Sequence, residues 1–568
     1  MLSMRSKLLL AAGICAATST GTYAAPGDIW GGGASVIAPY WRQTNDCFAL
    51  PTDLITKSSV SGGAPTLTPI TPFNYAGYGS SASGAQNCAT TQSTSKYTVY
   101  YVSATSGTGI LAQFSHNPQL WGYVNSAGTQ YAPDVDYNIS ETPLAQADVN
   151  IWNEGGTETQ GSSSVTVVAP GGTPGTGQYG NPLQLYGPLV QFPISIDPLP
   201  LAYSPVYEKV LNTSTNQVTS YSFHINKPNA DGSGGLRLSP TVYCGILNGQ
   251  ITNWNNAAIK ALNGNKSLED PNDPTPAASW SVPIELVGRG DSAGTTSTLT
   301  RHLSAVCPAL VTGNNYSTGT STLPSALRGN TYSTSNPNYP GVGTAGKFTL
   351  ATGNSGIAQY VAFTAAPGGS NPNTIVQGRI AYLSADYVLP YVNVTATNTY
   401  GLNTAVLENS SGHWIEPGPH AALLAFGSSS LPPQSTSSGA YDASATGDGY
   451  RSQPWSWVES TDPTAPIADP TAAGAYPVVG TANFLGYQCY ATNYPLATIQ
   501  ALFRYFEVQY VNTDATNGIL ASAGDEPLPP AWRTAIRQTF VTDPNGLGLA
   551  FSKKGSGTTC SAAGIVGG

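Results

Sequence analysis

The clearest pattern along the chain is an apolar strand followed by a glycine-rich turn and an amphipathic helix. Residues 284–287 are mostly apolar and predict a strand, and Leu299, Leu303 and Val306 then recur at helical spacing. Two later segments have apolar residues with the same spacing and predict helices: Ile499, Leu502, Phe503 and Phe506, and then Trp532, Ile536 and Phe540. Strands that alternate with helices in this way predict an α/β fold.

Long polar segments separate these regular stretches. They are rich in Gly, Ser, Thr, Pro and Tyr and have weak hydrophobic periodicity; they cover residues 89–130, 155–182, 312–345 and 395–470. A helix in such a segment would lack a continuous apolar face. We therefore expect insertions and long surface loops there.

Composition narrows the class of protein. The chain has 568 residues, of which 40% are hydrophobic, so a disordered chain is excluded and two large domains are expected. Only 9% of the residues are charged and the net charge is −9, whereas soluble domains usually have about 25% charged residues. The surface is therefore expected to be polar but weakly charged. It offers no basic patch for nucleic acid.

The first residues have the pattern of an export signal. Arg5 and Lys7 precede the apolar run 8–14, and small residues end at Ala24 and Ala25. We expect residues 1–24 to be a signal peptide and the protein to be periplasmic or secreted. No later apolar run approaches the roughly 18 residues of a membrane span.

Six cysteines follow the expected signal peptide. An even number in an exported chain favours three disulfides, although the sequence alone leaves their pairing open. No Cys-x-x-Cys motif occurs, so neither a metal site nor a cofactor is expected. The six are Cys47, Cys88, Cys244, Cys307, Cys489 and Cys560.

Three turns have the composition of anion-binding sites. In the turn 289–295, Gly290 and Gly294 let the backbone approach a ligand, Arg289 adds a forked cation that Asp291 can hold, and the N–H groups of a helix follow. The turns 77–84 and 31–36 also combine glycines with hydroxyl side chains. Each turn alone is weak evidence, because glycine–serine turns are common.

The same region also fits a hydrolase motif. Residues 290–294 match the Gly-x-Ser-x-Gly nucleophile elbow, with Ser292 as nucleophile and Asp386 and either His413 or His420 as later partners. Those histidines lie in a segment broken by prolines, and the elbow does not explain Arg289. A binding site for an oxyanion is therefore the preferred interpretation, and we expect no enzymatic activity.

Several blocks in order along the chain resemble one family. The segment 28–35 is close to the Asp-Ile-Asn-Gly-Gly-Gly start of the DING proteins, a branch of the periplasmic phosphate-binding proteins of ABC uptake systems. The further blocks are residues 75–81, 135–144, 244–254, 289–295, 353–358, 378–382, 488–490 and 527–532. Together they extend over most of the chain, while the polar segments fall outside the resemblance.

The resemblance implies a two-lobed, type II solute-binding α/β fold with long polar loop insertions. It places residues 25–203 and 396–568 in lobe one and residues 204–395 in lobe two. The ligand, inorganic phosphate, would be held between the lobes of a monomer and passed to an ABC permease. A secreted protein that acts on another macromolecule, with the anion incidental, is the alternative.

The family's site residues can be carried over position by position. Glu141 replaces the family's aspartate, and Ala293 replaces a serine but keeps its backbone N–H. The resemblance implies that Glu141 accepts a proton from phosphate, which disfavours sulfate. The expected phosphate-binding residues are Ser35, Val36, Ser80, Glu141, Arg289, Asp291, Gly294 and Thr295.

Disulfide pairing is also implied by the resemblance. It pairs Cys244 with Cys307 and Cys489 with Cys560, which leaves Cys47 for Cys88.

Overall fold

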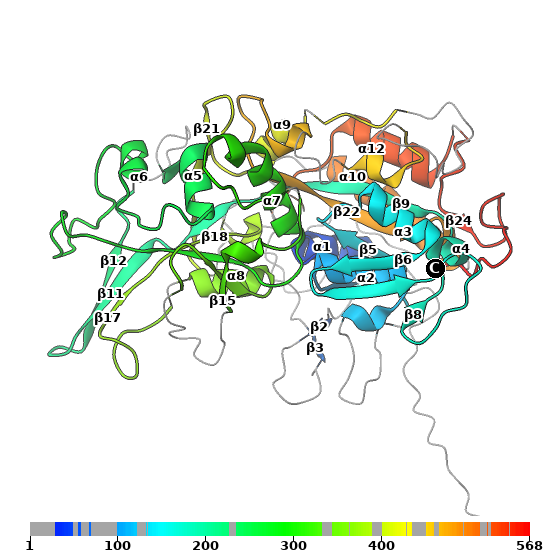
Figure 1. Ribbon diagram of the computed structural model, residues 1–568. Coiled ribbons are helices and arrows are strands. Elements are labelled where there is room, and N and C mark those ends of the chain that lie inside the picture. The colour runs from blue at the N-terminus through cyan, green and yellow to red at the C-terminus, as the bar shows by residue number, and fades with distance from the viewer. Residues whose placement is uncertain are drawn as a thin grey trace, which may run out of the picture.

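Two lobes lie side by side in the computed structural model (Figure 1). The structure describes residues 29–48, 55–57, 67–69, 99–121, 132, 134–225, 235–317, 319–331, 343–362, 364–388, 400–427, 429–433, 450–458, 465–491, 493–511, 520, 524–544 and 546–568. The expected signal peptide and the turn 77–84 lie outside these residues. In the described part, no helix has the length and hydrophobicity needed to cross a membrane.

The first lobe is built on a five-stranded sheet of order β4-β1-β5-β22-β9. The strands are β1 (Ile29–Gly33), β4 (Val99–Ser103), β5 (Tyr137–Ser140), β9 (Leu189–Pro198) and β22 (Val479–Tyr487). Strand β1 runs parallel to β4 and β5, whereas β22 is antiparallel to β5 and β9. Parallel strands require crossover helices, and these cover the sheet. The sheet thus combines segments from both ends of the chain.

Helices of the first lobe come from both ends as well. They are α1 (Ala38–Phe48), α2 (Ser106–Ser115), α3 (Gln146–Glu154), α4 (Pro182–Tyr186), α10 (Asn493–Val511) and α12 (Pro530–Ile536), with short turns η1 (Pro118–Trp121), η5 (Pro454–Trp457), η6 (Pro466–Ala468) and the π-helical η7 (Arg537–Val541). Phe503 of α10 packs edge-on against Phe484 of β22 and Phe192 of β9, with ring centroids 4.7 and 5.2 Å apart. The helices predicted around residues 499–506 and 532–540 are confirmed.

The second lobe is built on a six-stranded sheet of order β15-β16-β14-β18-β10-β19. The strands are β10 (Leu201–Tyr203), β14 (Ile284–Arg289), β15 (Arg328–Thr331), β16 (Phe348–Ala351), β18 (Gly378–Tyr382) and β19 (Asn403–Thr404). The helical elements are α5 (Pro240–Leu247), α6 (Ala257–Leu262), α7 (Gly294–Val306), α8 (Gly353–Val361), η2 (Cys307–Ala309), η3 (Ser325–Leu327) and η4 (Ala385–Tyr387). The predicted strand at 284–287 and the helix after it are confirmed.

Smaller sheets and one helix extend this framework. They are β6 (Gly156–Gln160), β7 (Ser163–Val167) and β8 (Gln178–Tyr179); β11 (Val206–Asn212), β12 (Gln217–Ser222) and β17 (Thr374–Val376); β13 (Arg237–Leu238), β20 (Val406–Glu408) and β21 (Trp414–Ile415); β2 (Ile55–Lys57) and β3 (Leu67–Pro69); β23 (Cys489–Tyr490) and β24 (Ser552–Lys553); and α9 (Pro419–Phe426).

All four of the polar segments contain regular structure. Segment 89–130 contains β4 and α2, and α2 is buried on nearly all sides. A helix that is buried all round has no polar face, so the amphipathic pattern that marks most helices is missing. Segment 155–182 forms the sheet β6-β7-β8. Segment 312–345 contains η3 and β15, and segment 395–470 contains β19, β20, β21 and α9. The expectation of long loops was therefore wrong for parts of all four segments.

The lobe boundaries expected at 203/204 and 395/396 remain a proposal. Strands β10 and β19 pair with each other in the second sheet, through Ala202 with Thr404 and Tyr203 with Asn403. This pairing favours a crossing between the lobes just before residue 201. Strand β20 pairs with β13, and β21 pairs with β20, so the chain stays with the second lobe to residue 415 before it returns.

Two of the three expected disulfides lie in the described part of the chain, and both are confirmed. Cys244 of α5 is bonded to Cys307 after α7, and Cys489 of β23 is bonded to Cys560. The pair Cys47–Cys88 lies outside the described residues, because Cys88 and the side chain of Cys47 are not described.

Candidate functional site

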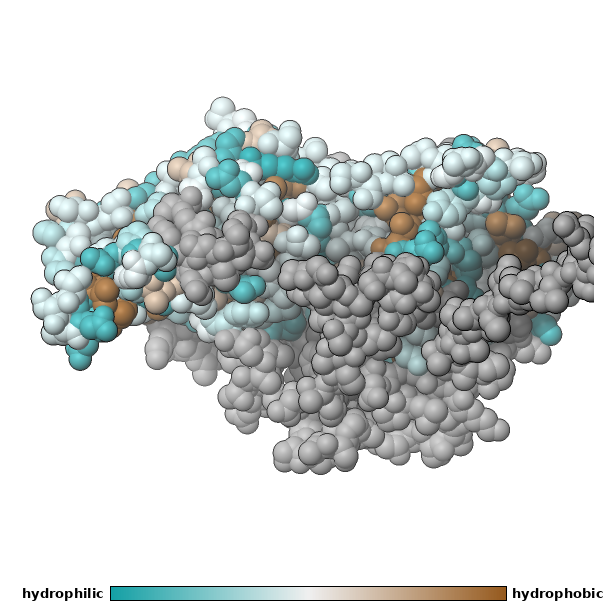
Figure 2. Space-filling model, turned by 90° about the horizontal axis from the view of Figure 1, so that it is seen from below, coloured by the Kyte–Doolittle hydropathy of each residue, from teal (hydrophilic) through white to brown (hydrophobic). Residues whose placement is uncertain are grey.

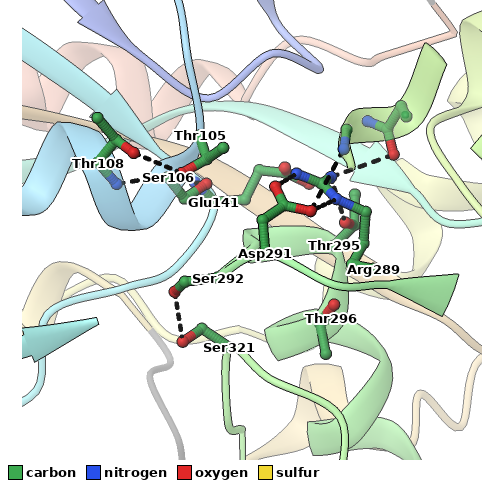
Figure 3. Close-up of polar contacts among 12 residues, drawn as sticks. Thr105, Ser106, Thr108, Glu141, Arg289, Asp291, Ser292, Thr295, Thr296 and Ser321 are labelled. Atoms are coloured by element: carbon green, nitrogen blue, oxygen red, sulfur yellow. Dashed lines mark hydrogen bonds and ion pairs between the residues drawn. The ribbon is translucent and has the colours of Figure 1, made fainter. Parts of the chain in front are cut away.

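Segments from both lobes meet where several parallel strands end. Strand β5 of the first lobe leads into Glu141, and β14 of the second lobe ends at Arg289. The helices that follow, α2 and α7, begin at Ser106 and Gly294 and direct their N-termini to the same place (Figure 3). Helix N-termini carry unpaired N–H groups and the positive end of the helix dipole, so this arrangement suits an anion.

Arg289 lies at the centre of this arrangement and is only 3% exposed. Its Nε donates to Asp291 Oδ1 at 2.8 Å, and Nη2 donates to Oδ2 of the same carboxylate. The remaining nitrogen, Nη1, donates to Thr295 Oγ1 at 3.3 Å and to Asn354 Oδ1 at 3.4 Å. These last two contacts are long for hydrogen bonds, so Nη1 can exchange them for a stronger acceptor. Asp291 therefore fixes the guanidinium and leaves one edge for a ligand.

The electrostatics keep this pair ionised. Burial alone would lower the pKa of Arg289, but the hydrogen bond and charge of Asp291 outweigh burial and raise it. Burial likewise would raise the pKa of Asp291, but the hydrogen bond and charge of Arg289 hold it below its usual value. The site therefore contains a permanent, buried positive charge whose partner is already in place.

Glu141 faces this cation from the other lobe. Its backbone N–H donates to Ser106 Oγ at 3.2 Å, and its carboxyl group accepts the backbone N–H of Thr295. Gly294 allows this approach, because a Cβ atom at Gly294 would lie 2.1 Å from Cβ of Glu141. The lobes are thus in direct contact at the start of α7.

The pKa of Glu141 is raised to about 8. Burial is the largest cause, and the charge of Asp197 raises this pKa by more than the charge of Arg289 lowers it. Burial also raises the pKa of Asp197 and Asp386 to about 7. Glu141 is therefore mainly protonated at pH 7 and can donate a hydrogen bond. This differs from the ionised acceptor that the resemblance implies.

The other expected site residues have different outcomes. Ser35 and Val36 lie in the turn between β1 and α1, and Val36 is 5% exposed. Ser80 lies outside the described residues. The N–H of Ala293 donates to the Ser321 carbonyl at 2.9 Å. This N–H was expected to remain as a donor to the ligand, but it already has a partner.

Three residues near Arg289 and Glu141 were not predicted as site residues. Ser106 lies in a polar segment interpreted as loop, although Thr105 before it is a helix N-cap residue whose side chain accepts the Thr108 N–H. Asn354 belongs to a block that resembles the family, without an assigned role. Tyr382 also belongs to such a block. Its hydroxyl accepts the N–H of Arg289 at 3.1 Å across 93 residues, so no local pattern could indicate this contact.

The nucleophile-elbow interpretation gains no support from the geometry. Ser292 Oγ donates to Ser321 Oγ at 2.8 Å and to Gln160 Oε1 at 3.3 Å, and Asp386 accepts from Ser384. In the described part of the chain, no histidine is hydrogen-bonded to Ser292. Ser292 therefore lacks the base that would activate it.

Known proteins resemble the chain over most of its length. Residues 60–499 match the PBP superfamily domain. Alkaline phosphatase L of Pseudomonas aeruginosa (strain UCBPP-PA14) is 26% identical over 342 residues, which cover 59% of this chain and 70% of that protein. A phosphate-binding protein from an unknown prokaryotic organism is 27% identical over 337 residues, covering 56% and 70%.

The fold has a solved counterpart as well. The crystal structure of a DING protein superposes with a TM-score of 0.51 and 19% identity, covering 95% of this chain and 99% of that chain. The two-lobed, type II solute-binding fold is thereby confirmed. The chain therefore belongs to the PBP superfamily.

Proposed function

We propose that this protein is an exported, non-enzymatic solute-binding protein that captures inorganic phosphate between its lobes. The observation that carries the proposal is the buried Arg289 guanidinium, which Asp291 holds with one edge directed at the N-terminus of α7. A forked, charge-assisted contact of this kind is well suited to a phosphate oxygen pair. The name of one relative described above, the phosphate-binding protein from an unknown prokaryotic organism, supports phosphate as the anion.

The proposed ligand set keeps the residues expected from the sequence. Arg289 Nη1 and the N–H groups of the first turn of α7 bind phosphate oxygens, Asp291 orients Arg289, and Glu141 closes the site from the first lobe. Ser35, Val36 and Ser80 are proposed to complete the set; the complete set is Ser35, Val36, Ser80, Glu141, Arg289, Asp291, Gly294 and Thr295.

The proton on Glu141 decides how the site treats different anions. A protonated carboxyl donates to phosphate or to sulfate, whereas an ionised one can only accept, and only phosphate brings a proton at neutral pH. We infer that phosphate is bound on both sides of the Glu141 pKa and sulfate only below it. Selectivity for phosphate thus increases as the pH rises.

We also propose that the lobes close around the ligand by a hinge motion and that the closed protein delivers it to an ABC permease. The expected signal peptide supports a periplasmic or secreted location, and we propose that the protein acts as a monomer. On the face shown in Figure 2, apolar atoms form small separate patches on a mainly polar described surface. The large apolar side chains described as exposed are Val218, Leu310, Tyr450 and Val566, from four separate segments. Capture of a macromolecule is therefore less well supported than capture of an anion.

The test is titration calorimetry with inorganic phosphate on protein freed of retained anion. Arg289→Ala is expected to weaken binding by about 30- to 5,000-fold, because a buried charge-assisted contact is worth about 2–5 kcal/mol. Arg237→Ala is a matched control, since Arg237 lies over the Trp414 ring outside the site. Equal phosphate affinity of folded Arg289→Ala and unmodified protein would exclude the proposed site.

A further inference from the structure

Asn354 lies at the edge of Arg289 that is left for a ligand. Strands β14 and β16 run parallel and pair Arg289 with Ala351, so both strands end at the same level of the second sheet. The chain then enters helix α8, whose second residue is Asn354. Its Oδ1 accepts from Arg289 Nη1 at 3.4 Å, and Nη1 is the nitrogen that Asp291 leaves uncovered. An anion bound to Nη1 would therefore lie next to the Asn354 amide.

The amide nitrogen of Asn354 is buried without a hydrogen-bond partner. The residue is 2% exposed, and in the described part of the chain no group accepts from Nδ2. A buried donor that makes no hydrogen bond destabilises a protein, and native structures contain few such donors. The contact with Arg289 also fixes which amide atom is which, because Nδ2 in place of Oδ1 would set two donors against each other. Asn354 thus has one unused donor beside the cation that is proposed to hold the ligand.

The start of α8 is held beside the site by Asp291. The Gly353 N–H donates to Asp291 Oδ1 at 3.3 Å, and the same carboxylate holds Arg289. Helix α8 is nine residues long, and the N–H groups and dipole at its N-terminus favour an anion. A carboxamide is neutral and can present its oxygen to a cation or its nitrogen to an anion. Asn354 therefore fits both the ligand-free and the anion-bound site.

We propose that Asn354 is a further anion-binding residue, whose Nδ2 donates to the bound phosphate once phosphate has replaced Oδ1 at Arg289 Nη1. The amide reaches the anion by rotation about χ2, a torsion that is broad and roughly two-fold in asparagine. This exchange gives a partner to the donor that the protein alone leaves unpaired. The inference rests on the proposed phosphate function and adds a contact that donates at every pH.

The test is calorimetry with phosphate and with sulfate at pH 6.5, on Asn354→Asp and Asn354→Ala. Aspartate has the size of asparagine but its carboxylate can only accept, whereas alanine removes the amide. Gln359→Glu is the matched control, because it makes the same change from amide to carboxylate at an exposed position of α8. The unfolding temperature of each ligand-free variant is measured as well.

Asn354→Ala is expected to weaken the binding of both anions by about 10- to 100-fold, the range for a hydrogen bond to a charged group. Asn354→Asp should weaken sulfate at least about tenfold more than phosphate, because only phosphate brings a proton to the carboxylate. Gln359→Glu should bind both anions normally. The unfolding temperature of ligand-free Asn354→Ala should stay within about 2 °C of that of the unmodified protein, since an unpaired donor is removed together with one long contact.

Equal losses of phosphate and sulfate affinity in Asn354→Asp would show that Asn354 only positions Arg289 and would overturn this inference. Variants of Asn354 that bind both anions as tightly as Gln359→Glu would overturn it too. A larger fall in the unfolding temperature of Asn354→Ala would assign the residue a structural role and have the same consequence.

A crystal structure of the phosphate complex is a second test, and it needs no variant. An amide atom of Asn354 is expected at hydrogen-bond distance from a phosphate oxygen. If both amide atoms lie further than about 3.5 Å from every phosphate oxygen, the direct contact is excluded. If the unmodified protein does not bind phosphate at all, the proposed function is overturned as well.

Discussion

Glu141 combines burial, a like-charged neighbour and a nearby cation in one side chain. Its pKa of about 8 places the loss of its proton within the range in which binding can be measured. The pH dependence of anion binding therefore tests directly whether the Glu141 carboxyl group faces the bound anion.

We predict that sulfate competes with phosphate at pH 6.5 and that this competition is lost by pH 9. Ionised Glu141 repels sulfate, and the affinity for sulfate should fall about tenfold per pH unit above the pKa. The measurement is the competition of sulfate against labelled phosphate across this range.

Glu141→Gln provides the control, because an amide donates at every pH. In this variant the affinity for sulfate should be nearly independent of pH. The same pH profile in Glu141→Gln and in the unmodified protein would show that another group causes the effect.

Gly294 allows a second prediction at this scale. A Cβ there would lie 2.1 Å from Cβ of Glu141 and 2.8 Å from its backbone, so Gly294→Ala should prevent the lobes from closing. We expect phosphate affinity to fall by about 100-fold or more, since one overpacked contact costs about 1–3 kcal/mol and the ligand loses the first lobe as well. Calorimetry measures the affinity, and small-angle scattering measures closure.

Gly356→Ala is the matched helical control, because its Cβ would meet only Ala351 Cβ at 3.8 Å. This variant should bind phosphate normally and should be slightly more stable, since alanine favours helices by about 1 kcal/mol over glycine. If the lobes of Gly294→Ala close to the same extent as those of the unmodified protein, the close contact between Gly294 and Glu141 is contradicted.

At the scale of the elements, the disulfide between α5 and the end of α7 stabilises the second lobe. It closes a loop of 63 residues, for which the chain-entropy relation gives about 4 kcal/mol. Replacing both Cys244 and Cys307 by alanine should therefore lower the free energy of unfolding by about 4 kcal/mol, measured by urea titration. A change below about 1 kcal/mol would indicate that the loop is already restricted in the unfolded chain.

The sequence predicts those elements whose apolar residues recur at a regular spacing. Helices α7 and α10 were found from apolar residues at helical spacing and strand β14 from a short apolar run, although α7 and β14 are buried on most sides. Helix α2 was missed because Gly107, Gly109 and Ala112 let neighbours pack around it, so apolar and polar residues do not separate into faces. Strands β6 and β7 were missed because serine and threonine alternate with too few apolar residues to mark a buried face.

In the site, contacts between residues close in the sequence could be predicted, whereas contacts between distant residues could not. Arg289, Asp291 and Thr295 lie within seven residues, so their association could be predicted from a turn and a helix start. Ser106 and Tyr382 contact this group only through the fold, at separations of 35 residues from Glu141 and 93 from Arg289. The protonation of Glu141 could not be predicted either, because it depends on burial and on Asp197 in a distant strand.

For the whole molecule, buried carboxyl groups determine how stability depends on pH. Glu141, Asp197 and Asp386 have pKa values of about 8, 7 and 7, against ordinary values of 4.5, 3.8 and 3.8. Between about pH 4 and pH 7 the folded protein therefore holds more protons than the unfolded chain. Stability from these groups is complete below the ordinary pKa values and is lost as the pH rises through the raised ones.

We predict that the ligand-free protein is more stable at pH 5 than at pH 7. The free energy of unfolding is expected to fall by about 1 kcal/mol per pH unit for each of the three carboxyl groups that is still protonated in the folded protein. Urea unfolding at pH 5, 6 and 7 measures it. Asp386→Asn, which keeps a partner for Ser384, should give a shallower slope, and a stability that rises over this range would contradict the raised pKa values.

The two described disulfides would have a consequence for the order of folding events if the protein is exported. Each joins cysteines that are neighbours in the sequence, Cys244 to Cys307 and Cys489 to Cys560, and each stays within one lobe. If the chain emerges N-terminus first into an oxidising compartment, consecutive oxidation of cysteines as they appear gives these two native pairs directly. Their formation then needs no disulfide isomerase, only an oxidant.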